Sequence, residues 1–450
     1  MSRMRVPLLA GVLLLPLTAA SCARCDRSGD GGAPAAASAS ASASAAASDA
    51  GPAARCTVVG APRLVGALAG EAAAATEGPV AFGAEIGGAI ADKAFVVGLR
   101  AAGLNGAAQI LELSFDGGPP HTLATLPASP GSAPAPLLAG ARDGARLVGT
   151  LAIAADARTF RLSRLGEDGA LSPLGEVAQS KDESEATAVI AGAAAPLVAW
   201  DDVDEKARLG RIRARLLDPT GKAPEAKPKN PKDKDAGDDE DSLSPSSSDA
   251  AWPELAIAPS GDRAALVWLS ERPESELVDA GGGEPSQLLA YRWVEAVVVD
   301  LATGKRLSTS RALTALDGHA QTFSVIWGDA GLVLAVRDDA RPTDGDGGEL
   351  WAVRVPIDAS GSLLEPARTS IADKDVAPGV AALLPRPSGA LVSWLAADGT
   401  ARLSPAFSAG SATVEPALRD RRVLSVHGDR VLASRLSGSG VELVVARCEP

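Results

Sequence analysis

Short apolar runs rich in Val and Leu recur along the chain from residue 56 to the C-terminus. Each run is bounded by Gly, Asp or Pro, which is typical of β-strands separated by tight turns. Seven of the runs align as equivalent strands, at 95–97, 146–148, 197–200, 266–268, 332–335, 391–394 and 430–432. The pattern therefore predicts seven repeated units.

Turn-forming residues predict the number and direction of the strands in each unit. A small-residue turn, such as 258–262, precedes most of the runs and folds an inner strand back onto the run. Later strands end at Asp/Gly turns, for example 115–117, 167–169 and 300–304. Such residues tolerate the positive φ of a tight reversal. We therefore expect each unit to contain four antiparallel strands.

Four-stranded units repeated with local turns resemble the blades of β-propellers. The resemblance covers 56–450 and implies an all-β fold, a seven-bladed β-propeller of four-stranded antiparallel blades. Three insertions, 222–250, 271–287 and 337–349, account for units longer than a usual blade. The first insertion passes from alternating Pro and Lys to an acidic cluster and then to Ser-rich sequence, so we expect it to be disordered.

The last unit predicts how the ring closes. It supplies only three strands, 423–427, 430–436 and 440–448, before the chain ends. A strand that begins at Cys56 precedes the first unit, so we expect this N-terminal strand to complete the last blade. Antiparallel pairing then places Cys56 beside Cys448, at a Cα separation of roughly 4.5 to 5.5 Å that a disulfide accepts. We predict a disulfide between them.

The N-terminus has the features of an export signal. Two arginines precede an apolar run, 6–17, which is shorter than the roughly 18 residues of a membrane-spanning helix. The small residues that follow and lead into Cys22 resemble the lipobox of bacterial lipoproteins. The resemblance implies a signal peptide, 1–21, and lipidation at Cys22, with ordinary cleavage near Ala20 as the alternative.

The segment 22–55 consists almost entirely of Ala, Ser, Gly, Pro and Asp, and it is predicted to be a tether without a core. Ala23, instead of Asp, follows the lipidated cysteine, which by resemblance implies export to the outer membrane. The chain as a whole resembles a bacterial lipoprotein with a β-propeller domain. We expect it to be anchored to the bacterial envelope through its lipid.

Composition limits the chemistry. The net charge of -13 and the 3% of aromatic residues argue against nucleic acid as a partner. His121, His319 and His427 fall in different units without a second metal ligand nearby, and no complete catalytic, nucleotide-binding or metal-binding motif is present. We predict neither a catalytic residue nor a cofactor.

Two weaker patterns have a structural interpretation that we favour. Asp344, Asp346 and Glu349 partly match a calcium-binding loop, but Glu349 stands where that loop needs Gly, which favours a solvated loop. Three tryptophans end equivalent strands and are expected to pack between neighbouring blades, not to form a ligand-binding ring: Trp200, Trp268 and Trp394.

The preferred function is a non-catalytic binding or scaffolding module whose partner is an envelope protein or a surface ligand. The connections 201–210, 271–287 and 337–349 join equivalent strands and are acidic, so we expect them to lie on one face and to attract a basic partner or a weakly held cation. The alternative is a propeller hydrolase or lyase with its site at the central channel, because propellers also carry enzymes.

Overall fold

The computed structural model divides the chain into two compact parts, Met1–Ala53 and Ala54–Pro450. The residues that it describes all belong to the second part: 55–65, 81–84, 93–100, 108–126, 136–140, 146–153, 158–166, 168–180, 188–191, 196–204, 209–218, 220, 222, 242–272, 291–339, 348–386, 389–407, 412–437 and 440–449. The predicted signal peptide, Cys22 and all but the last residue of the predicted tether lie outside the described residues.

The strands form antiparallel sheets that follow one another along the chain, and we number them as units. Unit 1 contains β2 (Ala81–Ala84), β3 (Ala94–Arg100), β4 (Ala108–Ser114) and β5 (His121–Leu126). Unit 2 contains β6 (Leu137–Gly140), β7 (Arg146–Ile153), β8 (Arg158–Leu165) and β9 (Leu171–Ser180). Unit 3 contains β10 (Ala188–Ala191), β11 (Leu197–Asp204) and β12 (Leu209–Leu216).

The remaining units complete the series. Unit 4 contains β13 (Asp249–Ile257), β14 (Arg263–Glu271), β15 (Arg292–Asp300) and β16 (Arg311–Ala312). Unit 5 contains β17 (Ala320–Gly328), β18 (Gly331–Asp338), β19 (Gly348–Pro356) and β20 (Ala367–Val376). Unit 6 contains β21 (Ala382–Arg386), β22 (Gly389–Leu395), β23 (Ala401–Pro405) and β24 (Thr413–Val414), followed by the 3-10 helix η2 (Pro416–Leu418). Unit 7 contains β25 (Arg422–His427), β26 (Arg430–Ser437), β27 (Gly440–Glu449) and, from the N-terminus, β1 (Arg55–Val65).

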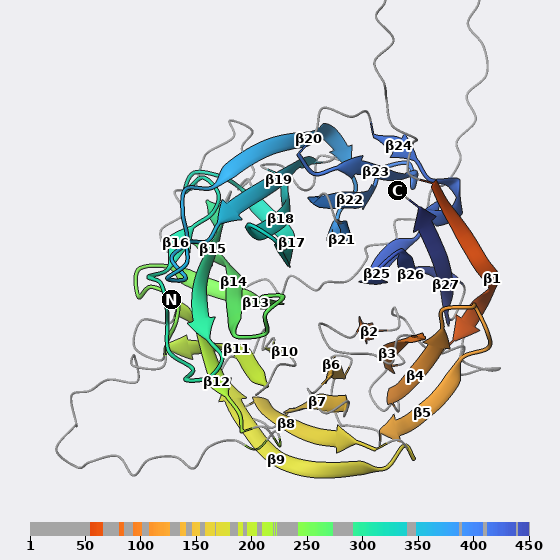
Figure 1. The fold of residues 1–450 in the computed structure, drawn as a ribbon, viewed down its shortest axis with the longest axis horizontal. Coiled ribbons are helices and arrows are strands. Elements are labelled where there is room, and N and C mark those ends of the chain that lie inside the picture. Colours follow the sequence, from red (N-terminus) through yellow and green to blue (C-terminus); the bar gives the residue numbers. More distant parts are fainter. Residues whose placement is uncertain are drawn as a thin grey trace, which may run out of the picture. The chain divides into compact units, whose positions relative to one another are not determined.

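The units form a closed ring. The first strand of each unit contacts the first strand of the next, and β25 contacts β2, so that the series returns to its start. Figure 1 shows these seven strands on the inner side and the later strands of each unit farther out. This arrangement of antiparallel sheets is a β-propeller. Each predicted run lies in the second strand of its unit, as the repeat requires.

The expectation of seven four-stranded blades is wrong, because the described residues form six blades of that kind and only three strands in unit 3. The chain does return to the outer edge of β12, where Ser242 bridges Arg213 and the Leu243 N–H bonds to the Ile212 carbonyl at 2.7 Å. The pairing stops there because Pro245, two residues on, has no N–H to offer. The Ile212 N–H bonds instead to the Ser244 hydroxyl at 3.0 Å.

The same segment corrects the C-terminal limit of the predicted disordered insertion, 222–250. Ser242, Leu243 and Ser248 are buried, and β13 begins at Asp249. The buried Arg211 donates to the carbonyl of Ser248 at 2.8 Å. Residues 242–250 therefore belong to the packed ring, while 223–241 lie outside the described residues.

The core is divided among the gaps between neighbouring units. Seven clusters of buried apolar side chains are present among the described residues, and each joins two consecutive units. The expected role of the tryptophans is confirmed, since Trp200 packs between units 2 and 3, Trp268 between units 3 and 4, and Trp394 between units 5 and 6. Both faces of a blade are buried in this way, which explains the apolar runs that replace strict alternation.

The N-terminal strand completes unit 7, as expected. β1 pairs with β27 at 55–59 and again at 63–65, with an irregularity between them, and Cys56 is directly opposite Cys448. The predicted disulfide between these two cysteines is present. Gly117, at φ +71° in a turn of unit 1, lies so close to β1 that a Cβ there would be 2.0 Å from the Val59 carbonyl oxygen. The closing strand β1 is therefore held on one side by β27 of unit 7 and on the other by the turn of unit 1 at Gly117.

Candidate functional site

The three acidic connections singled out by their sequence leave the sheets at points that the structure links together. They join β11 to β12, β14 to β15 and β18 to β19, the second and third strands of units 3, 4 and 5. We call the residues at the ends of these connections, together with the two residues of neighbouring strands that contact them, Asp249 and His319, the loop-base cluster. It consists of Asp202, Gly210, Asp249, Glu271, Arg272, Tyr291, Arg292, His319, Arg337, Asp338, Asp339 and Glu349.

Units 3 and 4 meet in this cluster through one carboxylate. Asp249, the first residue of β13, accepts the Gly210 N–H at 2.6 Å. A Cβ on Gly210 would lie 2.3 Å from the Ala250 carbonyl oxygen, so this approach requires glycine. Asp249 is opposite Glu271 in the register of β13 and β14. The base of the first connection is therefore fixed directly against the base of the second.

Ion pairs neutralise the charges at both bases. The Asp202 carboxylate pairs with Arg213 at 2.8 Å in unit 3, and the Glu271 carboxylate pairs with Arg292 at 2.8 Å in unit 4. The Arg292 backbone N–H also donates to the Gly318 carbonyl at 2.8 Å, which ties β15 to the connection between units 4 and 5.

An aromatic stack occupies the base of the second connection. Tyr291, the single tyrosine of the chain, stacks on His319 with ring centroids 5.3 Å apart and planes inclined by 23°. The guanidinium carbon of Arg272 lies 4.9 Å from the centroid of the Tyr291 ring, within range of a cation–π interaction. Arg272 and Tyr291 lie at the two ends of the connection, so their contact holds these ends together.

Unit 5 adds a buried polar arrangement at the third connection. The Asp338 carboxylate accepts the His319 backbone N–H at 3.1 Å, and Arg337 pairs with Asp339. Desolvation raises the pKa of the Asp338 carboxyl, and the neighbouring Glu349 and Asp339 carboxylates add to the rise against the opposing effect of His319. The group is therefore held beside other carboxylates by the fold of β18 and β19.

The calcium-loop candidates are not brought together as a site that can be described. Asp344 and Asp346 lie outside the described residues, and Glu349 accepts the Trp351 indole N–H at 3.0 Å. No group of three or more metal-ligating side chains occurs in the described part of the chain. Of the other histidines, His427 stacks on Phe115 between units 7 and 1, and His121 begins β5.

Glu254 is a notable carboxyl that the sequence analysis missed. It lies on β13, the innermost strand of unit 4, directly after a bulge in which Trp252 adopts φ +56°. Its carboxyl accepts the Val325 N–H of the neighbouring inner strand β17, and desolvation raises its pKa to about 8. An acidic residue within an otherwise apolar strand is the signal that could have identified it.

The described residues contain no helix long and apolar enough to cross a membrane. The chain matches no protein-family model and no curated protein. Its strand order and closed ring define it as a β-propeller protein.

Several solved structures are similar to this chain. Sqt1 of Saccharomyces cerevisiae has 11% identity and a TM-score of 0.45, covering 83% of this chain and 97% of its own. The β-propeller domain of the trilobed protease from Pyrococcus furiosus has 9% identity and a TM-score of 0.43, covering 82% and 93%. An α-L-arabinofuranosidase from Fusarium graminearum has 11% identity and a TM-score of 0.42, covering 82% and 92%. These similarities concern the fold alone, and the propeller assignment rests on the chain's own topology.

Proposed function

We propose that the protein is a lipid-tethered, non-catalytic binding or scaffolding propeller of the bacterial cell envelope, anchored to the outer membrane. The short apolar run before Cys22 and the Ala/Ser-rich segment 22–55 support the anchor and the tether. The disulfide between Cys56 and Cys448 supports export, since such bonds persist in oxidising compartments.

The loop-base cluster carries the binding role. The connections from β14 to β15 and from β18 to β19 are longer than their counterparts in the other units, and the shorter one from β11 to β12 lies in the adjacent unit. Hydrogen bonds, ion pairs and an aromatic stack fix the bases of all three relative to one another. Binding residues are commonly carried by loops that a rigid scaffold positions. A packed ring whose two longest connections between second and third strands leave adjacent units has this construction.

The chemistry of the partner follows from the residues of the connections. The segment 273–287 contains four acidic residues and no basic one, and 340–347 contains two aspartates and one arginine. At the bases the carboxylates of Asp202 and Glu271 are already paired with arginines. The remaining acidic residues belong to the connections, above all to 273–287, which favours a basic surface of an envelope protein as the partner.

Co-purification after gentle detergent extraction tests this proposal. In one variant, residues 273–287 and 340–347 are replaced by neutral Gly/Ser sequence of equal length. In the control variant the corresponding connection of unit 2, 154–157, is replaced in the same way. We expect the first variant to lose an envelope partner that the wild type and the control retain. Retention of every partner by the first variant would contradict the proposal.

The second candidate is a hydrolase or lyase with its site at the central channel, and Glu254 is the observation that favours it. A carboxyl with a pKa of about 8 is protonated at neutral pH, as a general acid must be. Glu254 is also on an innermost strand, where several units approach one another. Turnover of glycoside, uronide or ester substrates by the wild type, with loss of turnover in Glu254→Gln, would support this candidate.

A further inference from the structure

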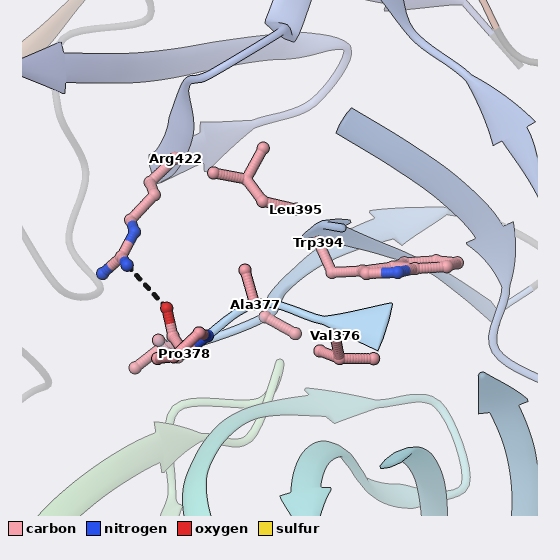
Figure 2. Close-up of a pocket in the computed structure, with 9 residues that line it drawn as sticks. Val376, Ala377, Pro378, Trp394, Leu395 and Arg422 are labelled. Carbon is pink, nitrogen blue, oxygen red and sulfur yellow. Dashed lines mark hydrogen bonds between the residues drawn. The ribbon is translucent and has the colours of Figure 1, made fainter. Parts of the chain in front are cut away.

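A small hollow lies where units 5, 6 and 7 meet (Figure 2). The connection from β20 to β21 forms one wall, Trp394 and Leu395 of β22 form another, and Arg422, the first residue of β25, lies at its edge. Its volume is about 10 Å³, which is room for a single water molecule or a methyl group. Any occupant must therefore insert a small group.

The walls of the hollow are mainly apolar. Val376 and Trp394 are buried in the core between units 5 and 6, so this side of the hollow is rigid. Val380, at the rim, is 50% exposed although it is apolar. The hollow therefore has a rigid apolar wall, formed by Val376 and Trp394, and an exposed apolar residue, Val380, at its rim.

The neighbouring backbone orients Arg422. Its Nη2 donates to the Pro378 carbonyl at 2.6 Å, as Figure 2 shows. Gly379, at φ +130°, packs so closely that a Cβ there would lie 2.7 Å from the guanidinium carbon. The guanidinium is therefore held in one orientation by a carbonyl at one edge and by a glycine against it.

Arg422 has no carboxylate partner among the described residues, unlike the arginines near it. Arg421 and Arg435 both pair with Glu442, at 2.5 and 2.9 Å. Desolvation lowers the pKa of Arg422, and no neighbouring acid opposes that effect. Arg422 is exposed, so N–H groups that no described carboxylate engages can reach a ligand. A guanidinium binds a carboxylate well, because the two planar groups can form parallel charge-assisted hydrogen bonds.

We propose that this hollow binds a carboxylate that carries a small apolar group, as at the C-terminal residue of a peptide ending in alanine. The free N–H groups of Arg422 hold the carboxylate, and the methyl group enters the hollow beside Trp394. The charge of Arg422 and the size of the hollow both favour this ligand over a neutral or a bulky one.

The inference names one ligand for the proposed binding propeller, and to that extent it rests on the proposed function. The hollow is formed by residues of units 5, 6 and 7 that are not members of the loop-base cluster. Failure of peptide binding here would leave the co-purification test of the acidic connections unaffected, so the two failures are distinguishable.

Titration calorimetry of the full chain in detergent tests the site. The probes are acetyl-glycyl-alanyl-alanine with a free C-terminal carboxylate, the same peptide as its C-terminal amide, and acetyl-aspartyl-alanyl-amide, whose carboxylate is on a side chain. We expect binding of the free acid, and binding at least about tenfold weaker for both other probes. Equal binding of the amide would overturn the role of the carboxylate, and equal binding of the aspartyl probe would overturn the choice of a chain end.

Variants separate the site from a general charge effect. Arg422→Gln keeps a donor for the Pro378 carbonyl but removes the charge, and it should weaken binding of the free acid at least about tenfold. Arg419→Gln is the matched control, because Arg419 carries the same charge three residues earlier and its side chain is 64% exposed. Val380→Asp, at an exposed position, should also abolish binding by placing a carboxylate at the rim. Thermal melts confirm folding; unchanged affinity in Arg422→Gln, or no binding of the free acid to the wild type, would overturn the proposal.

Discussion

The carboxylate of Glu415 accepts the backbone N–H of Cys56 at 2.7 Å, so a side chain of unit 6 holds the start of the strand that closes unit 7. Both residues are buried. Arg386, also from unit 6, donates to the Cys448 carbonyl at 2.8 Å. Unit 6 thus forms hydrogen bonds to both cysteines of the disulfide. Closure of the ring therefore depends on these hydrogen bonds as well as on the covalent bond.

Replacing Glu415 with alanine should destabilise the fold by about 1 to 3 kcal/mol, because the buried Cys56 N–H would lose its acceptor. Chemical denaturation of the oxidised protein measures the change. Glu365→Ala is a suitable control, since Glu365 is 85% exposed and pairs only with Arg311 at the surface. A loss in Glu415→Ala no larger than the control's would show that the hydrogen bond is unimportant.

The disulfide should contribute strongly to closure. It joins residues 392 positions apart, for which the chain-entropy model gives up to about 5 kcal/mol, a ceiling that strain and denatured-state structure reduce. Cys56→Ser and Cys448→Ser should each lower the unfolding temperature and expose β1 to proteolysis. An unchanged melting temperature in both variants, or alkylation of both thiols in the native wild type, would refute a closing role.

Lipidation at Cys22 remains a prediction, and mass spectrometry of the mature N-terminus decides it. We expect an acylated residue at position 22 and partitioning into detergent, with Cys22→Ser unmodified and released in soluble form. Cys25→Ser is the control, because Cys25 lies three residues later in the same segment. A mature chain that starts at Ser21, or one without an acyl group, would count against the anchor.

The repeat and its closure could be predicted because they follow from local turn chemistry and from the positions of two cysteines. The Asp/Gly turns were expected at 115–117 and 300–304, and Gly117 and Gly304 indeed adopt positive φ. The three-stranded unit could not be anticipated in this way, because it depends on how the serine-rich stretch 242–248 returns to β12 and on the proline within that stretch.

The candidate sites were harder to predict for a related reason. The environment of Glu254 is created by Val325 of the next unit, and the hollow at Arg422 is assembled from three units. Sequence patterns reveal strands and turns within a unit but not which side chains of different units meet. The loop-base cluster is the exception, because equivalent connections of successive units emerge together.

The raised pKa of Glu254 gives the fold a specific pH dependence. The carboxyl has a pKa of about 8 in the folded protein against an ordinary value of 4.5, so folding favours its protonated form. Stability from this group is therefore complete below pH 4.5 and is lost as the pH rises towards 8, by about 1.4 kcal/mol per pH unit and at most about 5 kcal/mol. The residual exposure of Glu254 to water makes the actual loss smaller. Glu254→Gln, which cannot ionise, should match the wild type near pH 4 and exceed it in stability at pH 8.5, as measured by denaturant titration at both pH values. Glu365→Gln should show no such crossover, and parallel pH profiles for Glu254→Gln and the wild type would mean that the carboxyl titrates normally in the folded protein.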